Sequence, residues 1–223
     1  MKQPVRKRSV RGGAAQAAGA GPSEARSTKA AARREAILDA ALDEFSAQGF
    51  AAARLDDIAT RAGVAKGTIY LYFVDKERLF QELIRSRMGP VVVDLEAVFS
   101  TGLPLRVIVE HAVDVFVREV FGTHRRQIIR LIISEGPRFP AIAEFYYREV
   151  LVRALEALRS FLRRAYERGE LPDDALVRFP QLLVAPGIVA IIWNGLFDRF
   201  EPLDIRDMMR AHFNALFGAR GAP

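Results

Sequence analysis

The chain has 223 residues, of which half are hydrophobic and 27% are charged, a composition that excludes a fibrous or fully disordered protein and allows a sizeable core. Cysteine is absent, which excludes disulfide bonds and thiolate metal sites. The net charge is +6, and residues 1–34 alone carry +8, because they hold nine lysines and arginines and a single acidic residue, Glu24; the remaining residues sum to −2.

The N-terminal segment, residues 1–27, is rich in alanine, glycine and charge and has no apolar periodicity. This composition predicts a disordered basic arm. The first interpretation of the arm is a solvated tail, and the second is a segment that binds phosphate. The segment lacks the apolar stretch of a signal peptide. The longest apolar run, residues 182–193, is too short to cross a membrane, so we expect a cytoplasmic protein without a membrane partner.

Helical spacing begins after Ser27 or Thr28, either of which can cap the helix that follows. No later stretch alternates as a strand does, so the fold class is predicted to be all-α. In the first helix an apolar stripe recurs at intervals of four residues and ends before Gly49, where a left-handed cap is expected. The stripe consists of Ile37, Leu38, Ala41, Leu42 and Phe45, and Phe50 is expected to pack back on Phe45.

Residues 54–73 contain two short helical segments that meet at Gly63. Glycine accepts the positive φ that a sharp turn between helices requires. Ala59 is small enough for a second helix to cross close to it, and Val64 and Ile69 are placed to pack on Ile58. The pattern predicts a helix-turn-helix motif.

Several residues after the turn are expected to point away from this apolar set. They offer an ammonium, a bare backbone, a hydroxyl and two phenols, which are groups that bind base edges and phosphates. These residues are Lys66, Gly67, Thr68, Tyr70 and Tyr72. Asp75 is expected to cap the next helix, with Glu77 in its first turn. We further expect the ammonium of Lys76 and the free N–H groups of that helix to converge on one phosphate.

Residues 31–91 resemble the DNA-binding domain of the TetR family. The matching elements are Arg33-Arg34-Glu35-Ala36-Ile37-Leu38-Asp39-Ala40-Ala41, Phe45, Gly49-Phe50, Asp57-Ile58-Ala59, Ala62-Gly63-Val64, Lys66-Gly67-Thr68-Ile69-Tyr70, Tyr72-Phe73 and Asp75-Lys76-Glu77. Further along, Ser134-Glu135-Gly136-Pro137-Arg138-Phe139-Pro140 resembles a TetR/AcrR subgroup.

The resemblance implies that the second short helix enters the major groove of double-stranded DNA. It places Lys66, Gly67, Thr68 and Leu71 near the bases, and Tyr70, Tyr72 and Lys76 on phosphates. The sequence departs from the family at Arg54 and Ala65, where relatives often have a hydroxyl side chain. Arg54 then supplies a charged phosphate contact in place of a hydroxyl one.

The second half predicts further helices over residues 105–120, 125–135, 140–168 and 204–217, with a broken helix over 173–200. The helix over 125–135 is apolar nearly all round and is expected to be buried. Gly169 is expected to end the long helix, and Pro186-Gly187 to kink the broken one. The predicted organisation is a basic arm (1–27), a three-helix DNA-binding domain (28–90, motif 54–73) and a C-terminal helical-bundle domain for effector binding and dimerisation (91–223).

The resemblance implies that the last two long helices, about 175–199 and 204–217, pair with their copies in a homodimer. A surplus of apolar residues supports this implication: Leu182, Leu183, Ile188, Ile191, Leu196, Phe213 and Phe217. The resemblance also implies a pocket for a small-molecule effector. Because aromatic residues are available to line this pocket, we expect the effector to be mostly apolar. The candidate wall residues are Phe116, Ile132, Tyr146, Trp193 and Asn194, and the alternative interpretation of each is a core residue.

No enzyme, cofactor or metal function is predicted. His111, His124 and His212 lie on different predicted helices without ligand spacing, and no catalytic motif is present. The preferred hypothesis is a homodimeric repressor that binds a near-palindromic operator and is released by its effector. Two alternatives stay open: a helical module whose partner is another protein, and a helical enzyme for an apolar substrate.

Overall fold

The computed structural model describes residues 22–218, which form helices without a single β-strand among them. The α-helices are α1 (Pro22–Ala52), α2 (Leu55–Arg61), α3 (Lys66–Tyr72), α4 (Lys76–Ser100), α5 (Leu105–Val115), α6 (Arg125–Glu135), α7 (Pro140–Tyr146), α8 (Arg153–Glu167), α9 (Ala175–Arg178), α10 (Gln181–Phe197) and α11 (Ile205–Phe217). Two π-helical segments, η1 (Phe116–Phe121) and η2 (Tyr147–Val152), continue α5 and α7. The all-α prediction is confirmed.

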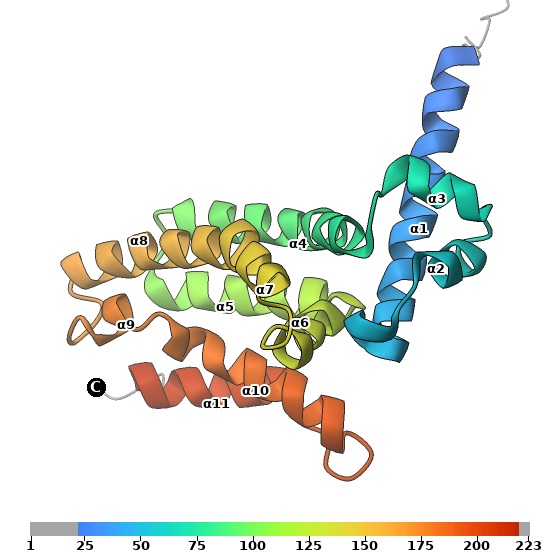
Figure 1. Cartoon of the computed structure of the whole chain (residues 1–223). Helices are drawn as coiled ribbons and strands as arrows, with labels where there is room; N and C mark the ends of the chain where they lie inside the picture. Colours follow the sequence, from blue (N-terminus) through green and yellow to red (C-terminus); the bar gives the residue numbers. More distant parts are fainter. Residues whose placement is uncertain (1–21, 219–223) are drawn as a thin grey trace, which may run out of the picture.

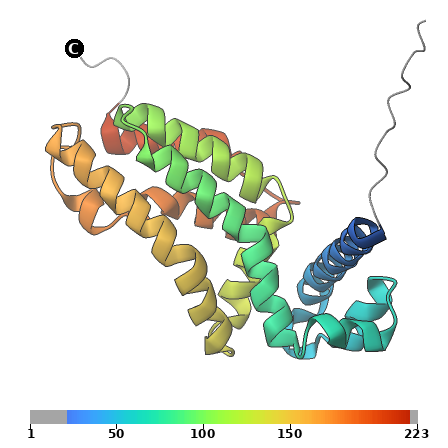
Figure 2. The ribbon, with the colours of Figure 1, turned by 90° about the horizontal axis from the view of Figure 1, so that it is seen from above.

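Helices α1–α3 form a head at one end of an elongated body that contains α4–α11 (Figures 1 and 2). Inside the body, α4 packs along α5 and α8, and α10 packs along α11. No helix within residues 22–218 has the length and apolarity that a bilayer crossing requires.

The start of α1 differs from the prediction. The helix begins at Pro22, so Ser27 and Thr28 lie inside it and cannot cap its first turn. Proline is well suited to the first helical position. Alanine, which forms the run Ala30-Ala31-Ala32, has the highest helix propensity of any residue type. The remainder of the expected basic arm, residues 1–21, lies outside the described residues.

A cluster of phenylalanines surrounds the break in α1 at Gly49, whose φ of 75° and ψ of 165° are not helical. The positive φ was predicted, although this ψ differs from that of a left-handed helical cap. The ring centroids of Phe45 and Phe50 are 5.5 Å apart, which confirms the predicted contact. Phe80 of α4 and Phe139 of the α6–α7 turn complete the cluster, at 5.5 and 4.9 Å from Phe50. The head is therefore packed directly on the body.

Helix α4 continues without interruption across residue 90, where the boundary between the two predicted domains falls. Its first half buries Phe80 and Leu83 against the head, and its last turn stacks Phe99 on Phe161 of α8 at 5.7 Å. One hydrophobic cluster extends from Ile37 in α1 to Tyr146 in α7. Because head and body share this core, α4 can transmit a displacement from one to the other.

The predicted helices of the body are largely confirmed. The bounds of α6 agree with the predicted 125–135, and Gly169 has a φ of 75° just after the helical stretch of α7, η2 and α8. One expectation for α6 is wrong, because Ile133 is 45% exposed although Ile128 is fully buried. The outward face of α6 meets solvent beside α10, a position that periodicity alone cannot reveal.

Candidate nucleic-acid interface and ligand cavity

The turn between α2 and α3 has the geometry that the motif predicted. Gly63 has a φ of 66°, and the N–H of Val64 donates to the carbonyl of Ala59 at 3.0 Å. Ile58, Ala59 and Ile69 are fully buried beneath the crossing. The apolar side of α3 is therefore fixed on the head, and its opposite side is presented outward (Figure 1).

Four residues form the exposed face of α3: Lys66, Gly67, Tyr70 and Leu71. Leu71 is 83% exposed and Tyr70 51%. Thr68 and Tyr72 are half-buried and lie between the exposed and the buried side of this helix. Tyr72 packs against the core near Phe73. The prediction that Tyr72 points away from the apolar set is wrong, because Tyr72 follows the buried Ile69 by three residues and packs partly against the core.

A carboxylate that the sequence analysis did not single out joins α2 to the exposed face of α3. Asp56 accepts a hydrogen bond from Lys66 Nζ at 3.0 Å through one oxygen and from the Tyr70 hydroxyl at 3.5 Å through the other. The sequence signal for this contact was weak, since an acidic residue in the first turn of a helix is also explained by the helix dipole.

Lys76 has a role that differs from the predicted one. Its ammonium donates to the carbonyls of Phe50 and Ala51 at 2.9 and 2.6 Å, and lies 5.0 Å from the centre of the Phe50 ring. Asp75 caps α4 as predicted and accepts from the N–H of Arg78 at 2.7 Å. The expected convergence of the Lys76 ammonium and this helix start on one phosphate is therefore not the arrangement seen, because the ammonium is directed to the end of α1.

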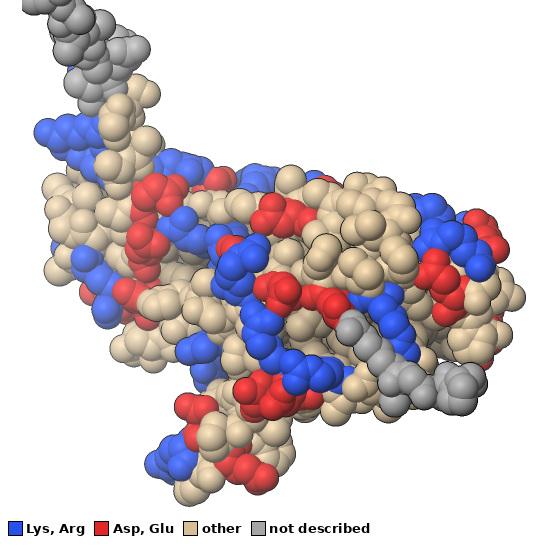
Figure 3. Space-filling view, turned by 180° about the vertical axis from the view of Figure 1, so that it is seen from behind, with Lys and Arg blue, Asp and Glu red and all other residues tan. Residues whose placement is uncertain are grey.

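Arg54 and Ala65 occupy the positions that precede α2 and α3, and neither supplies a capping side-chain bond in the described part of the chain. Arg54 is exposed on an extended backbone with a φ of −123°. Lysine and arginine side chains also gather near the start of α1 (Figure 3). The sequence places Arg26, Lys29 and Arg33 there, and each of them is exposed.

A small apolar cavity of about 140 Å³, partly open to solvent, lies in the body between α4, α5, α8, α10 and α11. No charged side chain lines it; its walls are Leu95, Phe99, Val109, Ala112, Val113, Phe116, Leu151, Ala154, Leu155, Leu158, Leu183, Val184, Met209 and Phe213. A Cβ atom at Gly187 would lie 2.8 Å from the ring of Phe116. Glycine at this position therefore allows the Phe116 ring to pack against α10.

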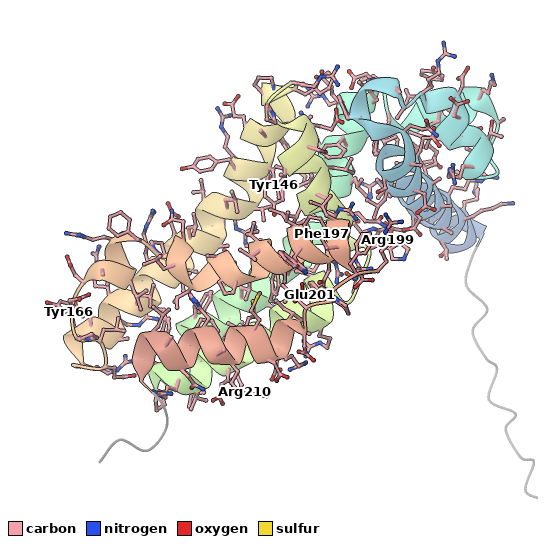
Figure 4. The ribbon with its side chains drawn as sticks, turned by 90° about the horizontal axis from the view of Figure 1, so that it is seen from below. Tyr146, Tyr166, Phe197, Arg199, Glu201 and Arg210 are labelled. Carbon is pink, nitrogen blue, oxygen red and sulfur yellow. The ribbon has the colours of Figure 1, made fainter. Side chains whose placement is uncertain are left out.

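Of the five predicted wall residues, only Phe116 lines this cavity. Ile132 and Tyr146 belong to the core that is shared with the head, where burial raises the pKa of the Tyr146 phenol. Trp193 donates from Nε1 to the carbonyl of Glu201 at 2.6 Å. The side chain of Asn194 makes two hydrogen bonds with the backbone of Leu203, at 3.0 and 2.8 Å. The indole and amide thus find their partners in the α10–α11 loop, which Figure 4 shows around Phe197, Arg199 and Glu201.

A second, larger hollow of about 580 Å³ lies between α5 and α11 and is open to solvent. It shares Val109, Val113 and Phe213 with the apolar cavity, but charged residues dominate its rim, among them Arg106, Glu110, Asp114, Arg206 and Arg210. Figure 4 shows Arg210 on the side of α11 that faces away from α10.

Helix α10 has an exposed apolar face, which α1 and α6 border on the side of Ile192 and Leu196 but leave largely open to solvent. Leu196 is the most exposed residue of this face in the helix, at 61%, and Phe200 just beyond the helix is 70% exposed. Leu182, Val189, Ile192 and Phe197 are its other members. Such a strip is costly to leave in water and is typical of a protein–protein contact.

Comparisons with known proteins agree with this architecture. Residues 37–83 match the family described as bacterial regulatory proteins, tetR family, and residues 105–212 match a tetracyclin repressor-like C-terminal domain. The transcriptional regulator AcrR of Shigella flexneri is 32% identical over 180 residues, which are 78% of this chain and 83% of that protein. The transcriptional repressor BepR of Brucella suis is 35% identical over 154 residues, or 66% of this chain and 72% of that protein.

Solved structures share the fold. The transcriptional regulator FadR from Bacillus subtilis, in complex with stearoyl-CoA, superposes with a TM-score of 0.63 at 20% identity, over 83% of this chain and 99% of that chain. The family matches cover both the helix-turn-helix head and most of the body. The chain therefore belongs to the TetR family, and it is a DNA-binding transcriptional regulator.

Proposed function

We propose that the protein is a homodimeric repressor whose α3 helix binds in the major groove of an operator. The observation that carries this proposal is the exposed face of α3, which the Gly63 turn holds outward while Ile69 anchors the opposite side. Lys66, Gly67 and Leu71 are then closest to the bases, with Thr68 at the edge of the helix. Tyr70 and Arg54 contact phosphates, and the basic start of α1 adds attraction for DNA of any sequence.

The exposed apolar face of α10 supports a second copy of the chain as the dimer partner. A two-fold axis would bring Leu196 and Ile192 of the two copies together, and a face of this kind is self-complementary in such an arrangement. Two heads joined in this way would dock about 34–36 Å apart in successive major grooves, which accounts for a near-palindromic operator.

The apolar cavity is our proposed effector site, with Phe116 as one wall. Its volume of about 140 Å³ is below the roughly 300 Å³ typical of ligand pockets, so binding must widen it. Since α4 lines the cavity and also packs on the head, widening would favour a different position of the head. An effector that binds the widened state more tightly would then release the operator.

The proposal is tested by selecting genomic fragments that the purified protein retains and measuring their affinity. We expect a fragment with two half-sites about 10 base pairs apart from centre to centre, bound with an affinity that falls steeply with salt. Tyr70→Phe should weaken this binding because it removes the hydroxyl group that donates to phosphate. A protein that retains no duplex even at low ionic strength is not the proposed repressor.

A further inference from the structure

One carboxylate is bonded to two members of the exposed face of α3. Asp56 uses one oxygen for Lys66 Nζ at 3.0 Å and the other for the Tyr70 hydroxyl at 3.5 Å. The side chains of Asp56 and Lys66 remain 43% and 68% exposed, so this ion pair lies on the surface that faces DNA in the proposed function. An anion at this place is unexpected, because the surface must approach a polyanion.

We infer that Asp56 is a specificity-determining residue of the DNA interface. It fixes the ammonium of Lys66 in one direction and at the same time lowers the affinity for DNA of unrelated sequence. This inference rests on the proposed function, since it concerns the same face of α3.

On an unrelated duplex the contacts are mostly to phosphates. The charge of Lys66 is then already balanced by Asp56, so that its binding releases fewer counterions from the DNA. In addition, the Asp56 carboxylate repels the nearby phosphates. This loss of affinity is the same for every unrelated sequence.

On the operator the same ion pair is useful. A free lysine has a flexible four-carbon stem and little directional preference. Held by Asp56 at its side, the Lys66 ammonium still has donors left for acceptors on a base edge, such as O6 and N7 of guanine. The energetic cost of the carboxylate is then offset by a directed base contact that unrelated sequences do not offer.

The neighbouring Asp57 provides a matched control. It lies in the same first turn of α2, is exposed and carries the same charge. In the part of the chain that the structure describes, no hydrogen bond or ion pair joins Asp57 to α3, whereas Asp56 has two. Asp56→Asn and Asp57→Asn therefore change the net charge and the helix-dipole interaction equally, and differ in the contact with Lys66 and Tyr70.

The experiment uses the full-length protein, the operator fragment obtained by selection, and a scrambled duplex of equal length and composition. Binding is measured between 50 and 200 mM salt, the range over which phosphate contacts dominate the change in affinity. Asp56→Asn should raise the affinity for the scrambled duplex by on the order of tenfold and steepen the slope of log K against log salt by about 0.9, the contribution of one phosphate contact. Affinity for the operator should rise less, so that the ratio of the two affinities falls. Asp57→Asn should leave this slope and this ratio close to those of the wild type.

Two further outcomes separate the inference from the proposed function. In a Lys66→Ala background, Asp56→Asn should no longer steepen the salt dependence, because the freed ammonium is missing. If Asp56→Asn and Asp57→Asn behave alike while the wild type still selects an operator, the inference is overturned and the proposed function stands. If the wild type binds neither duplex, the proposed function itself fails. Thermal unfolding of each variant verifies that the head is folded.

Discussion

The two glycines of the helix-turn-helix motif have different roles although both have open space around the position of a Cβ atom. Gly63 has a φ of 66°, whereas Gly67 lies in the first turn of α3. Gly63→Ala should therefore destabilise the fold by about 1 kcal/mol, because an L-residue disfavours positive φ. Gly67→Ala should stabilise it by about 0.5 kcal/mol through higher helix propensity. Urea unfolding measures both.

Gly67→Ala should at the same time weaken operator binding, since a methyl group would stand between the backbone and the bases. Opposite changes in stability and affinity cannot arise from loss of structure. If the operator affinity of this variant equals that of the wild type, the helix does not approach the bases at Gly67.

The ammonium of Lys76 donates to the carbonyls of Phe50 and Ala51, and these hydrogen bonds stabilise the end of α1. Lys76→Met keeps most of the aliphatic stem and removes these bonds, so we expect a loss of about 1–2 kcal/mol in the free energy of unfolding. Arg54→Met is the comparison, because its exposed side chain caps no helix: it should weaken DNA binding and leave stability almost unchanged. Equal stability of Lys76→Met and the wild type would exclude this structural role.

At the scale of helices, glycines and apolar stripes predicted most of the elements. Gly63 and Gly169 were correctly identified as helix ends because a positive φ is a local property of one residue. The π-helical segments η1 and η2 were not predicted, since an extra residue per turn is accepted only where tertiary packing requires it. The partners of Trp193 and Asn194 were also missed, because the path of the α10–α11 loop is not encoded in helical periodicity.

The start of α5 is held by a residue from another part of the body. Glu170 accepts from the N–H of Leu105 at 2.5 Å and also bonds Arg168. Partial burial raises the pKa of this carboxyl, but the bonds from Arg168 and Leu105 outweigh it and leave the pKa below its usual value. The charged form is thus favoured in the folded state, and its contribution to stability is present above the unfolded pKa of about 4.3.

Glu170→Gln keeps an oxygen that can accept from Leu105 but removes the charge that strengthens this bond and the one from Arg168, so it should destabilise the protein by about 1 kcal/mol at neutral pH. The difference from the wild type should shrink as the pH falls through the folded pKa of Glu170, where the wild-type carboxyl becomes neutral as well. Chemical unfolding at a series of pH values measures this difference. A difference that grows on acidification would contradict the assignment.

At the scale of the whole molecule, the exposed apolar face of α10 predicts that the protein is a dimer. Leu196→Glu places a charge at its most exposed helical position and should convert a dimer to a monomer, because the buried charge would be unpaired. Val93→Glu, at a residue of α4 that is 54% exposed, is the matched control and should remain dimeric. Sedimentation gives the mass of each. If Leu196→Glu sediments as the wild type does, the dimer uses another surface.

The sequence places a domain boundary at residue 90, whereas the contacts between the two parts become visible only in the structure. Composition and motifs located the head, but they did not reveal that α4 is continuous or that Phe50 packs on Phe139 across the two parts. Such contacts join residues far apart in the sequence, and neither periodicity nor local propensity carries information about them. The same reason explains why only Phe116 among the predicted wall residues lines the apolar cavity.

The position of Trp193 has a spectroscopic consequence. The sequence contains one tryptophan, and its indole lies in the α10–α11 region with Phe197 at 5.0 Å and the Glu201 carbonyl as its acceptor. Ultraviolet emission excited at the red edge of the absorption band therefore originates from this single place on α10, close to Leu196. A titration followed by this signal observes the end of α10, and because Ile192 and Leu196 line one hollow with Ser46 of α1, it also observes the place where this end approaches the head.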